Sequence, residues 1–246
     1  MGADRGTTQD GVFEQLFLRA LELMYSDIEP EPGFHRFINE CSDVVRSRAW
    51  DSLRRLDIPS DLRHIESWLS SLLEDEPPEP QIRGLYFGIS DPFVGVGYEL
   101  YLCGSSRYDS ADVDFAWAAN PDYWPEDRYS KSDVFHAMWA PSGQRQLPYQ
   151  LADDAIPLVY AGLLANWLSS RMSRVVLGNA KSRVIAVGHD EGDAYLLGIV
   201  DSDGYHKSSL KATLEAIGER ERQVERFVAG LEPGQRGHTD ENRDFP

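Results

Sequence analysis

Apolar side chains recur every three or four residues in three stretches of the first third of the chain, at 13–24, 34–45 and 62–73. This spacing places them on one face of an α-helix. Pro30 and Pro32 separate the first two stretches. Residues 74–80 are acidic and contain three prolines, which fit neither a helix interior nor a central strand. The pattern predicts a helical section over residues 10–76 and a linker over 77–82.

Beyond the linker the period of the apolar residues changes to two, which is typical of β-strands. Apolar residues alternate with other types at both ends of 85–103, so this segment should form a hairpin. A second hairpin is predicted at 184–200, where two apolar runs flank the short, Gly-containing turn 189–193.

Two later stretches, 155–169 and 207–229, again have helical spacing, whereas 231–246 is polar and without a period. We predict an α+β fold in which N-terminal helices and C-terminal helices pack with an antiparallel sheet that contains both hairpins. Three short helices bury little surface by themselves, so a single domain over 1–246 is expected. It would contain an α+β section over 83–229 and end in a disordered tail.

Acidic residues outnumber basic ones by 41 to 24, which gives a formal net charge of −17. Such a surface repels nucleic acid and anionic lipid, because phosphate groups are bound by clustered Lys and Arg. It would attract a basic protein and speed the encounter, although acidity can also serve solubility alone. The chain has neither an apolar run long enough to cross a bilayer nor the apolar core of a secretory signal. A cytoplasmic protein that binds no membrane is expected.

The turn of the second hairpin has the mixture of side chains found at metal sites. His189 is followed there by three acids, Asp190, Glu191 and Asp193. In a tight turn, however, Asp and Gly serve the conformation of the backbone. We therefore predict no metal and no cofactor for this chain.

A second acidic group lies in the irregular stretch that follows the first hairpin. Asp112 and Asp114 have the spacing that opens a calcium loop, but the later ligand and the glycine of such a loop are missing. Carboxylates within 109–127 could act as an acid–base pair in hydrolysis. No familiar catalytic or phosphate-binding motif accompanies them, so a carboxylate-based hydrolase stays an alternative.

Large aromatic residues and arginines gather in the same stretch: Arg107, Trp117, Tyr123, Trp124, Arg128 and Tyr129. These residue types form hot spots of protein–protein interfaces, and they also pack long loops onto sheets. Packing is the favoured interpretation for the tryptophans, and Arg128 is predicted to pair with a nearby carboxylate. Cys41 and Cys103 lie in apolar stretches and are expected to be buried, without a disulfide.

Several short blocks between residues 83 and 200 follow one another in a recognisable order: 84–88, 98–105, 108–109, 114–117, 123–129, 187–193 and 197–198. Together they resemble a family of bacterial immunity proteins that accompany polymorphic toxins and type VI secretion effectors. The resemblance implies a cytoplasmic protein that is not an enzyme and that binds and blocks one toxin. An adaptor or chaperone for an effector is a further alternative.

The toxin that such a protein neutralises is expected to have a basic surface, because this chain is strongly acidic. Acids on exposed loops are then the expected contacts. The candidates, beginning with the hairpin turn, are Asp190, Glu191, Asp193, Asp112, Asp114 and Arg128.

Overall fold

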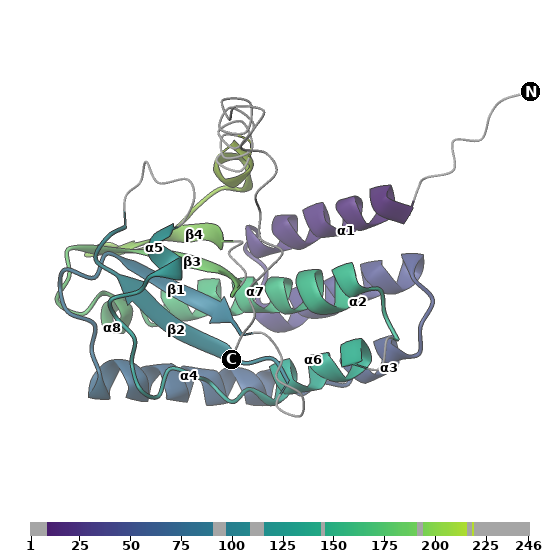
Figure 1. Ribbon diagram of the computed structural model, residues 1–246, viewed down its shortest axis with the longest axis horizontal. Coiled ribbons are helices and arrows are strands. Elements are labelled where there is room, and N and C mark those ends of the chain that lie inside the picture. The colour runs from purple at the N-terminus through teal and green to yellow at the C-terminus, as the bar shows by residue number, and fades with distance from the viewer. Residues whose placement is uncertain are drawn as a thin grey trace, which may run out of the picture.

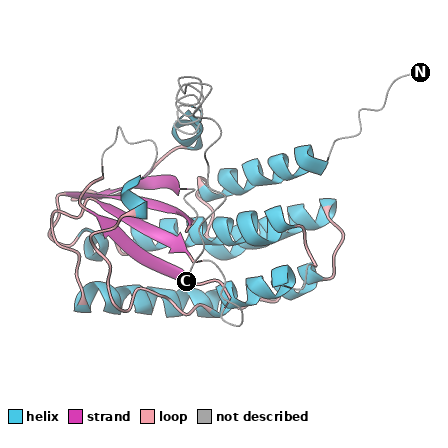
Figure 2. Ribbon diagram, in the orientation of Figure 1, coloured by secondary structure: helices cyan, strands magenta, loops and turns pink. Residues whose placement is uncertain are grey.

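A five-stranded sheet with helices before, between and after its strands makes up the described part of the chain (Figures 1 and 2). The structure is a computed structural model that describes residues 9–90, 97–108, 116–143, 146–190, 194–215 and 218. The predicted α+β class is confirmed. Within these ranges, no helix combines the length and the apolar character needed to span a membrane.

Four helices form the N-terminal section: α1 (Gln9–Met24), α2 (Pro30–Val44), α3 (Ala49–Leu53) and α4 (Ile58–Asp75). Pro30 starts α2, where its missing N–H costs no hydrogen bond and its fixed φ suits the first turn. At the start of α4, the Asp57 carboxylate accepts a hydrogen bond from the Ser60 backbone N–H at 3.0 Å. The apolar spacing predicts three of these helices, and α3 is too short to show a period.

The sheet has the strand order β2-β1-β3-β4-β5, with β1 at Gly84–Ile89, β2 at Leu100–Ser105, β3 at Ser182–His189, β4 at Ala194–Asp201 and β5 at Gly204–Lys207. Both predicted hairpins are present, because β1 pairs antiparallel with β2 and β3 with β4. β1 and β3 run parallel, however, with Gly84 opposite Val184. The sheet is therefore mixed where an antiparallel one was expected, since the long connection between the hairpins returns the chain to the end where β1 began.

This connection contains five helical segments: α5 (Ala116–Ala119), α6 (Asp133–Gly143), a π-helix (Gln150–Ala155), α7 (Ile156–Arg171) and α8 (Ser173–Leu177). α7 matches the helix predicted at 155–169. It is buried along nearly its whole length, because it contacts four strands as well as α1 and α2 (Figure 1). A helix in such a position must be apolar all round, which explains why its sequence has no polar face.

The C-terminal helix predicted at 207–229 begins later than expected. Lys207 is the last residue of β5 and pairs with Gly198, and the helical residues that follow are 210–215. β5 is only four residues long and includes polar residues, so its sequence has no clear alternation. Residues 219–246, which include the predicted tail 231–246, lie outside the described residues.

Two clusters of buried side chains pack on the sheet. The larger joins the N-terminal helices and α7 to the sheet, and the smaller comprises Tyr86, Tyr101, Cys103, Trp117, Ala186 and Ala194. Cys41 belongs to the larger cluster and Cys103 to the smaller one, and both are buried and form no disulfide, as predicted. Burial raises the pKa of each thiol to about 12, so both stay protonated at neutral pH.

Arg183, the second residue of β3, is a cation with no exposed surface. Its guanidinium donates hydrogen bonds to four backbone carbonyl oxygens, at 3.1 Å to Leu177, 2.8 Å to Ile82, 2.9 Å to Pro78 and 3.3 Å to Glu79. Burial lowers the pKa of Arg183, but a guanidinium titrates so far above neutral that the charge persists. Three of the four acceptors belong to the linker, so Arg183 fastens the linker to the sheet.

Replacing this side chain should therefore be costly. The Arg183→Ala variant leaves four carbonyl oxygens without their donor and opens a cavity, so the free energy of unfolding should fall by about 3 kcal/mol or more. Urea-induced unfolding measures the loss, with Arg63→Ala on the exposed side of α4 as the control expected within about 0.5 kcal/mol of the parent chain. Equal losses in the two variants would contradict the anchoring role of Arg183.

Candidate partner-binding site

Residues 122–130, named here the edge loop, run antiparallel along the outer edge of β2. The pairing comprises hydrogen bonds from Leu102 N to Arg128 O at 3.0 Å, from Gly104 N to Tyr123 O at 2.9 Å, and from Ser130 N to Leu100 O at 2.8 Å. Between the two paired ends, residues 124–127 leave the strand direction. The backbone of β2 thus fixes both ends of a short projecting segment.

The end of α4 holds this segment in place. The Glu76 carboxylate accepts hydrogen bonds from the backbone N–H groups of Glu126 at 3.0 Å and Asp127 at 3.4 Å. The Tyr123 hydroxyl donates to the Glu76 carbonyl oxygen at 2.7 Å, and the Trp68 indole N–H donates to the Asp127 carbonyl oxygen at 2.9 Å. Side chains and backbone therefore anchor the edge loop to the helical section.

Trp124 is the large aromatic residue of the edge loop that stays half exposed, with 48% of its surface accessible. The Arg128 guanidinium carbon lies 4.3 Å from the centre of its ring, and the ring of Tyr101 lies edge-on at 5.7 Å. Arg128 also stacks on Tyr129 and donates to the Pro125 carbonyl oxygen at 3.1 Å. Among the described residues no carboxylate forms an ion pair with Arg128, which instead stacks on Trp124 and Tyr129.

A hollow of about 430 Å³ lies beside Trp124, between the linker and the edge loop. We name it the acidic hollow, because Glu76, Glu79 and Asp122 line it and its described lining residues include no Lys or Arg. Desolvation opposes ionisation of Asp122, but hydrogen bonds donated by Ser106 outweigh it and hold the pKa of Asp122 below its ordinary value. Asp122 is thus ionised at neutral pH, next to an exposed aromatic ring.

The structure brings two of the predicted contact residues together around Tyr101. Asp190, at the end of β3, accepts a hydrogen bond from the Tyr101 hydroxyl at 2.5 Å, while Trp124 and Arg128 lie at the other side of the aromatic group. Burial, reinforced by the charge of Asp190, raises the pKa of Tyr101, so its hydroxyl remains a donor. The other candidates, Glu191, Asp193, Asp112 and Asp114, lie outside the described residues.

Sequence reasoning missed the carboxylates of the acidic hollow. Glu76 and Glu79 fall in the segment assigned to the end of a helix and a linker, and Asp122 is an isolated acid. Their spacing in the sequence gives no signal, because the pairing of the edge loop with β2 is what brings Asp122 beside the linker.

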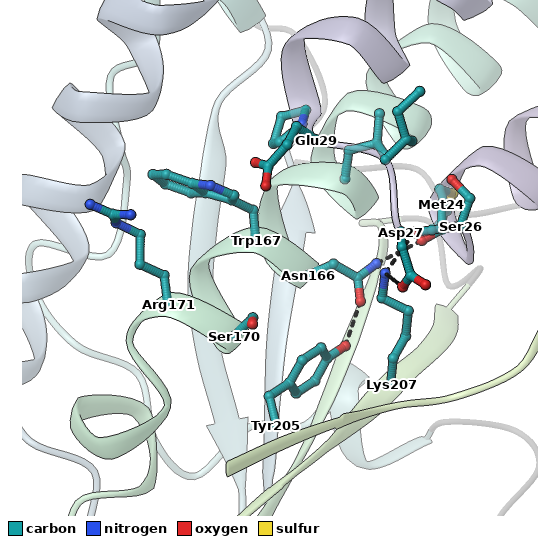
Figure 3. A pocket seen from close by; sticks show the side chains of 13 residues that line it. Met24, Ser26, Asp27, Glu29, Asn166, Trp167, Ser170, Arg171, Tyr205 and Lys207 are labelled. Atoms are coloured by element: carbon teal, nitrogen blue, oxygen red, sulfur yellow. Dashed lines mark hydrogen bonds and ion pairs between the residues drawn. The ribbon is translucent and has the colours of Figure 1, made fainter.

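A second hollow, of about 470 Å³, lies between the loop after α1, α7 and β5 (Figure 3). Its polar groups satisfy one another: Lys207 Nζ donates to the Ser26 carbonyl oxygen at 2.6 Å, and Asn166 Nδ2 donates to the Met24 carbonyl oxygen at 2.8 Å. The Tyr205 hydroxyl in turn donates to Asn166 Oδ1. These bonds tie β5 and α7 to the loop after α1, which is a structural role.

Asp61 of α4 is a buried carboxylate that also serves the fold. It accepts hydrogen bonds from Ser132 Oγ at 2.7 Å and from the Tyr160 hydroxyl at 2.8 Å. Burial and the neighbouring Asp61 raise the pKa of Tyr160 well above its ordinary value, so the hydroxyl stays a donor. This network joins α4, α7 and the start of α6.

Metal binding was tested against the arrangement of possible ligands. Among the residues that the structure describes, no group of three or more His, Cys, Asp or Glu side chains could hold a metal ion. His189, the first residue of the predicted metal-like turn, has its Nε2 3.1 Å from the Asp154 carbonyl oxygen.

Comparisons with protein-family models, with curated proteins and with solved structures each found no match.

The anchoring of the edge loop can be measured directly. Glu76→Ala removes the acceptor of the Glu126 and Asp127 amides, so hydrogen exchange in residues 122–130 should quicken by about tenfold, because a hydrogen bond to a charged group is lost. Glu76→Gln keeps one acceptor oxygen and should change exchange less. Glu74→Ala, an exposed acid on the same helix, is the control. Unchanged protection in Glu76→Ala would show that β2 alone holds the loop.

Proposed function

We propose that this chain is a binding protein of the immunity type, which captures a basic toxin or effector domain through the surface around Trp124. The observation that carries the proposal is a half-exposed tryptophan on an anchored loop beside the acidic hollow. In this proposal the chain blocks its partner by steric and electrostatic contact, without catalysis. It would act in the cytoplasm, against one partner.

The residue types of this surface suit a protein interface. Trp, Tyr and Arg dominate the binding energy of known interfaces, and here Trp124 is in contact with both Tyr101 and Arg128. Since the loop is held by Glu76 and by β2, little conformational entropy would be lost on binding. A rigid aromatic anchor therefore gives more affinity than the same residue on a flexible loop.

The charge of the surface specifies the partner. A Lys or Arg side chain entering the acidic hollow would meet Glu79 and Asp122 and could stack on the open face of Trp124. The formal net charge of −17 adds long-range attraction, which speeds association with a basic protein. Nucleases and other proteins that bind polyanions have such basic surfaces.

The resemblance of residues 83–200 to bacterial immunity proteins supplies the biological class. It includes the block 123–129, which forms most of the edge loop. The resemblance and the surface chemistry both favour binding to a protein.

Co-expression with a candidate toxin encoded beside this chain tests the proposal. Rescue of growth, together with a complex that elutes as one species in gel filtration, is the expected result. A complex without rescue would overturn the immunity role in favour of an adaptor or chaperone. Neither rescue nor complex would remove protein binding and leave the carboxylate-based hydrolase as the candidate.

The role of Trp124 gives a quantitative prediction. Trp124→Ala should weaken the complex by about 2 kcal/mol or more, or roughly 30-fold in Kd, mainly through faster dissociation. Surface plasmon resonance measures both rate constants, and Tyr149→Ala, which truncates an exposed aromatic residue elsewhere, is the matched control. Both variants should unfold cooperatively like the parent chain. Affinity equal to the control would place the interface on another surface.

A further inference from the structure

Three cations line one hollow at one end of the sheet. Arg83 directly precedes β1, and Lys181 directly precedes β3. These two strands are parallel neighbours, so their first residues lie at the same end. β2 is antiparallel to β1 and therefore ends there, where it is followed closely by Arg107.

These residues line a hollow of about 1180 Å³, which we name the basic groove. Its described lining residues include Arg83, Arg107 and Lys181 but no Asp or Glu, although acids outnumber bases by 41 to 24 in the chain. Among the ion pairs of the described residues, none involves these three cations. All three side chains are exposed, so solvent or a ligand can reach them.

The backbone that presents the cations is well fixed. Arg83 N donates to the Ser105 carbonyl oxygen at 2.9 Å, and the Arg83 carbonyl oxygen accepts from Val184 N at 2.7 Å. Arg107 donates from one terminal nitrogen to the Asn120 carbonyl oxygen at 2.5 Å and from its backbone N–H to Ser105 Oγ at 3.1 Å. These hydrogen bonds fix the backbone from which the side chains of Arg83 and Arg107 extend, as in preorganised anion sites.

Apolar groups adjoin the charges in the basic groove. Val184 and Ile199 project from the sheet, and Ile199 keeps 41% of its surface exposed, while Tyr108 forms part of the wall. A ligand with an anionic head and an apolar or aromatic body would satisfy both kinds of surface. Such ligands bind in concave sites where a few charged groups fix one end.

We propose that the basic groove binds an oxyanion of the phosphate class, carried by a small molecule. The guanidinium groups of Arg83 and Arg107 can each present two parallel N–H donors to phosphate oxygens, and Lys181 adds a point charge. A multiply charged anion is favoured because its several oxygens can contact the three cations of the groove at once. This site is separate from the surface around Trp124 and does not depend on the proposed partner.

Isothermal titration calorimetry with inorganic pyrophosphate, on the full chain at low ionic strength, tests the proposal. Saturable binding is expected that weakens when the salt concentration rises to about 0.15 M. The double variant Arg83→Gln/Lys181→Gln should bind at least about tenfold more weakly, because it loses two charged donors. The control Arg55→Gln/Arg63→Gln removes the same charge from exposed positions outside the groove and should bind like the parent chain.

Each other outcome overturns the proposal. No saturable heat with pyrophosphate, or equal binding by the groove variant and the control, would show that the three cations form no site. Stronger binding of tricarballylate than of pyrophosphate would replace the phosphate class with carboxylates. Thermal unfolding in the absence of ligand verifies that both double variants remain folded.

Discussion

The structure depends on one buried charge. Arg183 has no contact with solvent, and the carbonyl oxygens of Leu177, Ile82 and Pro78 replace the water it has lost. A guanidinium in the core is costly unless its donors are satisfied, so the linker must follow the path that delivers its carbonyl groups. That path fixes where the helical section meets the sheet.

Both proposed sites follow from this junction. Glu76 and Glu79 border the acidic hollow, Arg83 borders the basic groove, and Gln81 between them lines both. A surface suited to cations thus adjoins one suited to anions along the linker that Arg183 holds. The backbone between these two surfaces is fixed from the core side by the Arg183 guanidinium, which binds the carbonyl oxygens of Pro78 and Ile82.

The sequence predicts the helices and strands whose apolar residues recur with a clear period. It does not predict features that depend on pairing between distant segments. Apolar spacing alone predicts the buried face of α4 and both hairpins. It also predicts that Cys41 and Cys103 are buried. The parallel pairing of β1 with β3 does not, because a strand's pattern is the same whichever neighbour it has. Of the candidate site, Arg128 and Asp190 were identified from residue type, but the role of Glu76 depends on hydrogen bonds to amides 50 residues away. Nothing in the sequence indicated that Arg183, which lies within an apolar strand, is buried.

The edge loop also protects the sheet from other chains. An uncovered edge strand offers its N–H and C=O groups to any other extended chain and so invites aggregation. Here Tyr123, Arg128 and Ser130 occupy those groups on β2, and β5 at the opposite edge is only four residues long. The side chains at 124–127 can therefore change while the main-chain pairing on either side is kept. The chemistry of the surface around Trp124 is in this way separated from the protection of the sheet edge.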